Sequence, residues 1–344
     1  MDGADGLISF PFEAAPAEGE ALEVAPGILW MRLPLPMKLD HVNIFALDEG
    51  ESWTVVDTGF HSKRGEAIWE GLLAGPLAGK PVGRVVLTHH HPDHVGMAGW
   101  LAAKGAEIWA TRTAWLMARM LTLDVQPVPT EESLAFYRAA GMEADIYAER
   151  AASRPFNFAD IVHPIPLGFR RLRQGDAITM GGRRWVVHVG HGHAPEHATF
   201  WSEDGLVLAG DQILPGISPN LGVYPTEPEA DPVGEWLESC ERLLGVAEPG
   251  HLVLPGHKLP FHGLRLRLEQ LIENHHGALA RLEAHLAEPK TAADCFAPLF
   301  KREIGGGEYG LALVEAYAHC NHLFQAGRLR RWRGANDAWM WQAG

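Results

Sequence analysis

Cysteine is scarce in this sequence, and long hydrophobic runs are absent. The three cysteines, Cys240, Cys295 and Cys320, are odd in number and widely spaced. This pattern argues against a disulfide framework and against a zinc site built from cysteine. No stretch approaches about 18 consecutive apolar residues, and the acidic start MDGADGLISFPFE differs from the basic start of a signal peptide. We therefore expect a cytoplasmic protein with no membrane partner.

Positive charge is also in short supply. The chain has 29 lysines and arginines against 43 aspartates and glutamates, a formal net charge of -14. Proteins that bind nucleic acid usually present a basic surface, which supplies most of their affinity. The sequence therefore disfavours nucleic acid as a partner and favours a small-molecule substrate. Its one dense basic cluster lies near the carboxyl terminus and is interpreted as a solvated charged edge: Arg328, Arg330, Arg331 and Arg333.

The composition is that of a globular protein. Hydrophobic residues make up 47% and charged residues 21% of the 344 positions. This length accommodates one large α/β domain and a smaller module. From Leu22 onward, short apolar runs alternate with turn residues and predict strands. Residues 62–75 have helical periodicity and lead into a strand at residues 84–88, which together indicate a βαβ unit.

A ten-residue stretch, VLTHHHPDHV at positions 86–95, carries the strongest chemical signal. His89, His91, Asp93 and His94 fall within six positions, directly after an apolar run. Imidazole nitrogens and a carboxylate oxygen suit zinc or a similar divalent ion. One such loop could supply two metal ions, but neither ion would have a complete shell from it alone. Further histidines or aspartates are therefore expected at the ends of other strands.

The pattern H-x-H-x-D-H after a buried strand resembles the signature of the metallo-β-lactamase superfamily. The sequence looks like a member of its glyoxalase II-like, binuclear branch over residues 26–258. Three further family motifs follow in order: the stretch GHGHAPEH at 190–197, Gly210-Asp211, and Pro255-Gly256-His257. The alternative interpretation of the cluster is a histidine-rich turn that binds nothing.

The resemblance implies a set of seven metal ligands. One metal ion would take three histidines, and the second would take an aspartate and two histidines. One aspartate would be shared between the two ions. The residues are His89, His91 and His193 for the first ion, Asp93, His94 and His257 for the second, and Asp211 as the shared ligand. The ions are predicted to be zinc, with manganese or iron as alternatives that ligands of this hardness do not separate.

Residues outside the ligand set are also implied by the resemblance. Asp57 matches a family aspartate that orients a ligand histidine, with a turn former as the alternative interpretation. His191 and His197 are interpreted as residues that pack or hydrogen-bond behind the ligands.

The resemblance implies an α/β fold, the αββα sandwich of the superfamily, in which two mixed sheets are flanked by helices. We expect an amino-terminal arm at 1–25, a catalytic domain at 26–258 and a carboxyl-terminal helical module at 259–344. The module ends in an alternating, hairpin-like tail and resembles the winged-helix appendage of some members. A helical insert at 113–168 is rich in methionine and aromatic residues. It is interpreted either as a lid over the active site or as a packing layer or homodimer surface.

The activity implied by the resemblance is hydrolysis by a metal-bridging hydroxide. Asp93 is the candidate catalytic residue, which passes a proton to the leaving group. The favoured substrate is a thioester, a lactone or another small acyl ester. The alternatives are a phosphodiesterase or nuclease that uses the same binuclear site, and a metal-binding scaffold without catalysis.

Overall fold

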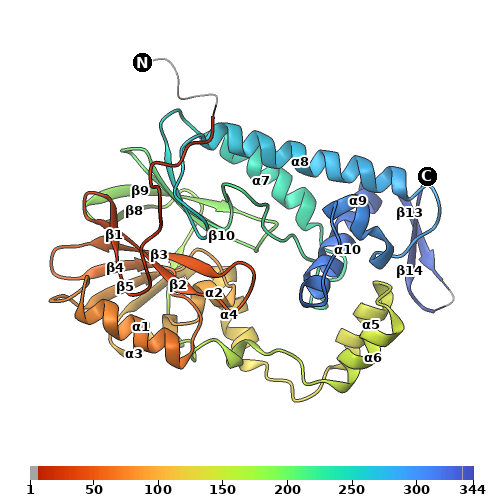
Figure 1. Cartoon of the computed structure of the whole chain (residues 1–344), viewed down its shortest axis with the longest axis horizontal. Helices are drawn as coiled ribbons and strands as arrows, with labels where there is room; N and C mark the ends of the chain where they lie inside the picture. Colours follow the sequence, from red (N-terminus) through yellow and green to blue (C-terminus); the bar gives the residue numbers. More distant parts are fainter. Residues whose placement is uncertain (1–6, 335) are drawn as a thin grey trace. The chain divides into compact units, whose positions relative to one another are not determined.

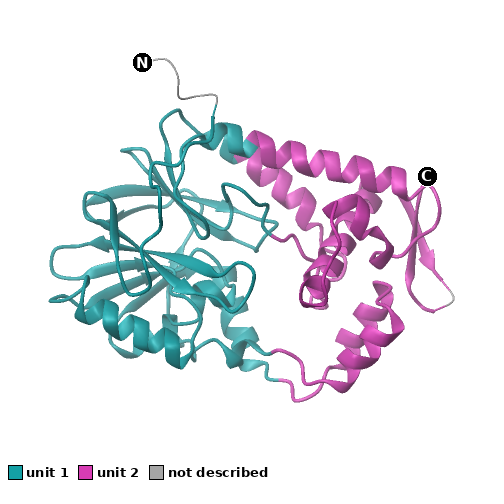
Figure 2. Cartoon of the chain, viewed as in Figure 1, with its two compact units in different colours: residues 1–125, 157–219, 243–268 teal, residues 126–156, 220–242, 269–344 magenta. Residues whose placement is uncertain are grey.

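The computed structural model describes residues 7–334 and 336–344. The first six residues of the predicted amino-terminal arm lie outside this part. The chain forms two compact units, each assembled from three separate segments (Figure 2). Unit 1 contains residues 1–125, 157–219 and 243–268, and unit 2 contains residues 126–156, 220–242 and 269–344.

A seven-stranded mixed sheet forms one layer of unit 1 (Figure 1). Its first four strands pair antiparallel, and the strands from the fourth to the seventh pair parallel. In spatial order the strands are β1 (Leu22–Ala25), β2 (Ile28–Pro34), β3 (His41–Asp48), β4 (Trp53–Val56), β5 (Val82–Val86), β6 (Glu107–Thr111) and β7 (Arg170–Leu172).

A five-stranded sheet forms the second layer of unit 1. Its neighbouring strands pair antiparallel, except for the two that come last in the sequence of this sheet, residues 206–210 and 252–255, which pair parallel. In spatial order the strands are β12 (Leu252–Pro255), β11 (Leu206–Gly210), β10 (His197–Ser202), β9 (Arg183–Gly190) and β8 (Ala177–Met180).

The hydrophobic core between the sheets follows from the two-residue period of the strands. On β2, Ile28 and Trp30 belong to the core shared with the second sheet, whereas Met31 and Leu33 belong to the core on the opposite face. The second sheet contributes Phe200 and its neighbours to the shared core. A one-residue slip of β2 would exchange the two faces, so burial on both sides fixes its register.

Helices cover the outer face of the seven-stranded sheet. Helix α1 (Lys63–Ala74) begins after Ser62, whose hydroxyl oxygen accepts a hydrogen bond from the Gly65 amide. Its buried side chains, including Trp69, pack against the sheet together with those of α3 (Ala98–Ala103) and α4 (Arg112–Leu123). The predicted helix at 62–75 and the αββα fold class are confirmed.

Unit 2 is mainly helical. Its buried side chains include Tyr317 and Trp341, whose ring centroids lie 5.7 Å apart. The predicted carboxyl-terminal hairpin is confirmed, because its two strands pair antiparallel. The elements that contribute to this unit are α5 (Glu131–Ala139), α6 (Ala144–Ala152), α7 (Pro232–Leu244), α8 (Leu264–His285), α9 (Phe296–Phe300), α10 (Tyr309–Gln325), β13 (Leu329–Arg333) and β14 (Trp339–Ala343).

Part of the predicted insert packs with the carboxyl-terminal helices. Phe136 of α5 lies against Tyr317 of α10, with ring centroids 5.2 Å apart. The Tyr309 hydroxyl hydrogen-bonds the Glu143 carboxylate. Both contacts lie inside unit 2. They favour packing as one role of the insert, and its action as a lid stays a prediction, as do the predicted domain boundaries.

No helix within the described ranges combines the length and the apolar character that crossing a bilayer requires.

We predict that Phe200→Ala destabilises the protein far more than Leu123→Ala. Phe200 is fully buried between the sheets, so its truncation should cost roughly 3–5 kcal/mol. Leu123 is 66% exposed, and its truncation should stay within about 0.5 kcal/mol. Urea unfolding followed by near-ultraviolet circular dichroism would compare the two variants. Equal losses would contradict the packing described for the shared core.

Candidate metal centre

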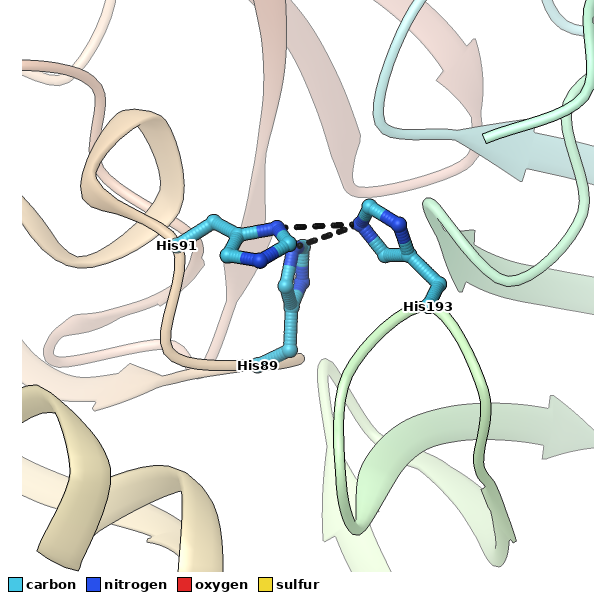
Figure 3. Close-up of side chains that lie close together, drawn as sticks. All are labelled: His89, His91 and His193. Atoms are coloured by element: carbon cyan, nitrogen blue, oxygen red, sulfur yellow. Dashed lines mark hydrogen bonds between the residues drawn. The ribbon is translucent and has the colours of Figure 1, made fainter. Parts of the chain in front are cut away.

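Three histidines bring ring nitrogens to one point in unit 1. His89 Nε2 lies 3.0 Å from His91 Nδ1, which lies 3.0 Å from His193 Nε2. The third side of this triangle, His193 Nε2 to His89 Nε2, measures 3.3 Å. Figure 3 shows the three rings turned toward one another from two different loops. Nitrogens bound tetrahedrally to one zinc ion at roughly 2.0–2.1 Å would stand about 3.3 Å apart, so the spacing suits a shared ion.

A second group of ligand atoms gathers around Asp93. His257 Nε2 lies 3.3 Å from Asp93 Oδ2, and His94 Nε2 lies 3.6 Å from the same oxygen. Both imidazoles are buried, whereas the carboxylate retains some exposure. One carboxylate and two imidazole nitrogens again converge on one point.

Asp211 stands between the two groups. Its Oδ2 lies 3.1 Å from His257 Nε2 and 3.6 Å from His193 Nε2, and its Oδ1 lies 3.4 Å from His94 Nε2. The structure therefore brings together all seven residues that the sequence predicted as ligands.

Strand ends deliver these residues. The first cluster follows β5, His193 follows β9, Asp211 follows β11 and His257 follows β12. Strands β9, β11 and β12 run in the same direction, so their carboxyl ends share one edge of the five-stranded sheet. Side chains that follow these strands therefore meet, as open α/β sheets generally allow.

Two glycines permit the close approach of the strand ends. A Cβ atom on Gly256 would lie 2.2 Å from Asp211 Oδ1, and one on Gly210 would lie 2.6 Å from His197 Cε1. Gly210 also has a φ of 50°, a conformation that glycine adopts at little cost. Steric crowding therefore explains why the G-D and P-G-H motifs have glycine at these positions.

Hydrogen bonds behind the ligands fix their rings. Asp57 Oδ2 accepts from His94 Nδ1 at 2.8 Å and from the Thr88 hydroxyl at 2.8 Å. The Thr88 oxygen lies 2.9 Å from His89 Nδ1 and accepts its hydrogen. Because Nδ1 is engaged in these hydrogen bonds, Nε2 is the nitrogen of both histidines that faces the cluster and is available to a metal ion. The predicted contact of Asp57 with a ligand candidate, His94, is present, and its orienting role stays a prediction. Sequence reasoning missed Thr88, whose only signal was its place between strand and cluster.

Two more histidines support the site without joining the ligand groups. His257 Nδ1 donates to the His41 carbonyl oxygen at 2.7 Å, which leaves His257 Nε2 for the cluster. His197 Nε2 accepts from the Asp211 amide at 3.1 Å, and its ring stacks on His89 at 4.6 Å. The interpretation of His197 as a supporting residue is confirmed. The role of His41 was missed, because nothing near it in the sequence points to a residue 216 positions away.

Electrostatics separates the two groups. Burial, reinforced by neighbouring imidazoles, lowers the pKa of His89 and of His91 well below the usual range. Burial also acts to lower the pKa of His94 and His257, but adjacent carboxylates outweigh it. They raise the pKa of His257 to about 10 and that of His94 well above its ordinary value. His89 and His91 are therefore neutral imidazoles ready to bind a metal ion, whereas His94 and His257 hold protons that a bound cation would displace.

The donor atoms fit a divalent metal ion. His94 Nε2 and Asp211 Oδ1 are buried and have no hydrogen-bond partner within the described part of the chain. A buried polar atom without a partner is costly, and a cation beside these two atoms would satisfy both. Neutral imidazole and carboxylate together suit zinc and related ions.

Family models match most of this sequence. The model described as "Metallo-beta-lactamase superfamily" matches residues 37–257, the range that holds every predicted ligand. This chain belongs to the metallo-β-lactamase superfamily. A second model, "Metallo-beta-lactamase-like, C-terminal domain", matches residues 279–343. The chain is thus a member of a metallo-hydrolase superfamily whose fold implies divalent metal binding.

Several superfamily proteins resemble the whole chain. The crystal structure of a β-lactamase domain protein from Burkholderia ambifaria is similar to this chain, with 37% sequence identity and a TM-score of 0.85. The match covers 98% of this chain and 97% of the Burkholderia chain. The metallo-β-lactamase family protein TTHA1429 from Thermus thermophilus is 28% identical, covers 94% of this chain and 100% of its own, and has a TM-score of 0.78. The "Probable metallo-hydrolase YqjP" of Bacillus subtilis (strain 168) is 25% identical over 86% of this chain and 92% of its own.

These similarities confirm part of the sequence interpretation. Superfamily membership and a superfamily-type carboxyl-terminal module are confirmed. The glyoxalase II-like branch and the winged-helix character of the module stay predictions. The number and identity of the metal ions also stay predictions.

We predict that Asp57→Asn weakens metal binding by about 10- to 100-fold, the range for residues that orient a ligand. Asp57 accepts hydrogen bonds through both oxygens, from the Thr88 amide at Oδ1 and from His94 Nδ1 at Oδ2, whereas asparagine has one accepting oxygen. Its amide nitrogen would therefore oppose either the Thr88 amide or His94 Nδ1, and both arrangements disturb the position of a ligand candidate. Asparagine also tolerates the left-handed backbone of this position, with a φ of 61°, so the fold should persist.

Competition with a metal chelator would measure the affinity. The matched control is Asp204→Asn, which changes a carboxylate paired with Arg183 outside the ligand groups. Equal affinity of the Asp57 and Asp204 variants would contradict the orienting role.

Proposed function

We propose that the protein is a binuclear metal-dependent hydrolase of a small acyl ester, such as a thioester or a lactone. The observation that carries this proposal is the position of Asp211. Its two oxygens lie within 3.6 Å of histidines from both ligand groups. A carboxylate placed in this way suits two neighbouring cations rather than one.

The seven residues form two sets of ligands, one for each proposed metal ion, with one residue shared. His89, His91 and His193 would hold one ion, and Asp93, His94 and His257 would hold the other. Asp211 would serve both. Divalent ions bound there would lower the pKa of a water molecule and polarise the oxygen of the bond under attack.

Asp93 is positioned to move the proton. Its side chain is 17% exposed, compared with 9% for Asp211, so its carboxylate is the more accessible of the two. Although burial acts to raise the pKa of Asp93, the charges of His94 and His257 lower it below its ordinary value. The ionised carboxylate can therefore accept a proton and pass it to the leaving group.

The arginine cluster does not favour a nuclease. Arg328 pairs with Glu283, and Arg331 Nη2 lies 3.0 Å from Glu229 Oε2. The Arg331 guanidinium also stacks over the ring of Trp339 at 4.2 Å. Charges already paired inside unit 2 offer little to phosphates. Together with the net charge of -14, this arrangement favours a small substrate over nucleic acid.

We predict two divalent ions per chain in protein purified without chelator. Asp211→Ala should weaken binding of both ions, whereas Asp93→Ala should weaken mainly one. Hydrolytic activity should fall in both variants far more than folding stability. Elemental analysis gives the stoichiometry and thermal unfolding gives the stability. A reproducible value near zero after metal supplementation would refute the proposal, and a value near one would refute its binuclear form.

We also predict turnover of a thioester or lactone and negligible binding to single- or double-stranded nucleic acid at physiological salt. A genuine nucleic-acid site would show binding that falls steeply with salt, and Arg330→Ala and Arg331→Ala would reduce that slope. An acyl hydrolase should retain its rate in both variants. Cleavage of RNA or DNA that is lost in His89→Ala would reverse the substrate assignment while leaving the metal site intact.

A further inference from the structure

A pocket of about 340 Å³ lies beside the metal centre in unit 1. Lys258, one of its lining residues, directly follows the ligand His257. Its lining residues include Arg32, His41 and Lys258, with Phe10, Pro215 and Leu259 as apolar walls. We call it the Arg32–Lys258 pocket.

Strand direction places the pocket at the metal-binding edge of the sheets. Lys258 and Leu259 follow the carboxyl end of β12, and Pro215 follows that of β11. His41 is the first residue of β3, which runs antiparallel to β4. The start of β3 therefore lies at the edge of the sheet where β4 ends, and the parallel strand β5 ends at the same edge. These are the strand ends that carry the metal ligands.

Arg32 brings a positive charge into the pocket. Its Nε donates to Asn43 Oδ1 at 3.0 Å, and its Nη2 donates to the Lys258 carbonyl oxygen at 2.8 Å. Among the described residues, it forms no ion pair with a carboxylate. Burial lowers the pKa of Arg32 to about 10, and Asp40 opposes that effect. The Asp40 carboxylate itself is 80% exposed and lies 2.6 Å from His41 Nδ1.

Lys258 adds a second charge from a costly backbone conformation. Its φ is 71°, in the left-handed region that residues with a side chain rarely adopt. The backbone is fixed there, because its amide donates to His41 Nε2 and its carbonyl oxygen accepts from Arg32 and Asn43. Within the described chain, the ammonium group forms no ion pair, and its charge is one of the smaller causes that lower the pKa of the exposed Asp40 carboxyl. Backbone strain of this kind clusters at functional sites, where the side chain it positions has a use.

We propose that the Arg32–Lys258 pocket binds an oxyanion, a carboxylate or phosphate, carried on an apolar arm of the substrate. Two cations that lack a carboxylate partner would hold the oxyanion through charge-assisted hydrogen bonds, and the apolar walls would pack against the arm. The inference rests on the proposed function, since it places the scissile acyl bond at the neighbouring metal centre. It makes the substrate an anionic ester rather than a neutral one.

Direct binding tests the pocket without requiring turnover. Hexanoate, butyl phosphate and the neutral hexanamide would be titrated into the metal-loaded protein and followed by calorimetry. The test variant is Lys258→Gly, which removes the charge and relaxes the backbone. The matched control is Lys301→Gly, because Lys301 is an exposed lysine of unit 2 with a φ of 54°.

We expect at least one anion to bind the wild type and the Lys301 variant, and to bind the Lys258 variant about tenfold more weakly. The stronger of the two anions identifies the oxyanion as carboxylate or phosphate. Hexanamide should bind weakly and equally to all three proteins. Absence of anion binding, equal anion binding to both variants, or hexanamide binding as strong as that of the anions would overturn the proposal.

Kinetics separates this inference from the proposed function. A thioester that carries a terminal carboxylate would be compared with its neutral amide analogue. Lys258→Gly should raise KM for the anionic thioester about tenfold more than it raises KM for the neutral analogue, and kcat should change by the same factor for both. If neither thioester is hydrolysed but the anions still bind through Lys258, the hydrolase proposal fails and the pocket stands. If both are hydrolysed with no effect of Lys258, the pocket fails alone.

Discussion

Charge balance inside the ligand cluster is the constraint on which the site depends. Asp57, Asp93 and Asp211 place three carboxylates among histidines at one edge of the sheets, and burial of such charges is costly unless each is compensated. Protons on His94 and His257 supply part of that compensation, and divalent cations would supply it more fully. The same arrangement that makes the cluster unfavourable without positive charge makes it suitable for divalent cations.

The fold meets this constraint through rigid strand ends. The cluster combines side chains from both sheets, whose shared core of alternating residues holds the sheets together. The strand ends are packed so closely that a Cβ atom on Gly210 or Gly256 would clash with neighbouring side chains of the cluster. The Arg32–Lys258 pocket uses the same edge, so an anionic arm and a scissile bond could be held by one rigid framework. The pocket residues would then decide which substrate binds, and the neighbouring metal-binding residues would carry out the hydrolysis.

The local sequence predicted much of this arrangement, for physical reasons that act over a few residues. Two-residue alternation in strands such as β2 and the helical period of α1 record which face is buried. The spacing of His89, His91, Asp93 and His94 places four donors after one strand, and resemblance to a known family extended the set to the remaining ligands. Such patterns can be read from the sequence because burial on one face, and the need for a donor atom, limit which residue types fit at each position.

The sequence by itself, through its periodicity and its resemblance to a known family, determined the fold class, the strand ends that carry the predicted ligands and the chemistry of those donors. Only the tertiary structure decided which side chains stand behind the ligands, such as Thr88 and His41, and that segment 126–156 packs with the carboxyl-terminal helices. It also decided that Arg32 and Lys258, 226 positions apart, line one pocket. These contacts join residues distant in the chain, and no local period or spacing encodes the closure of a long loop.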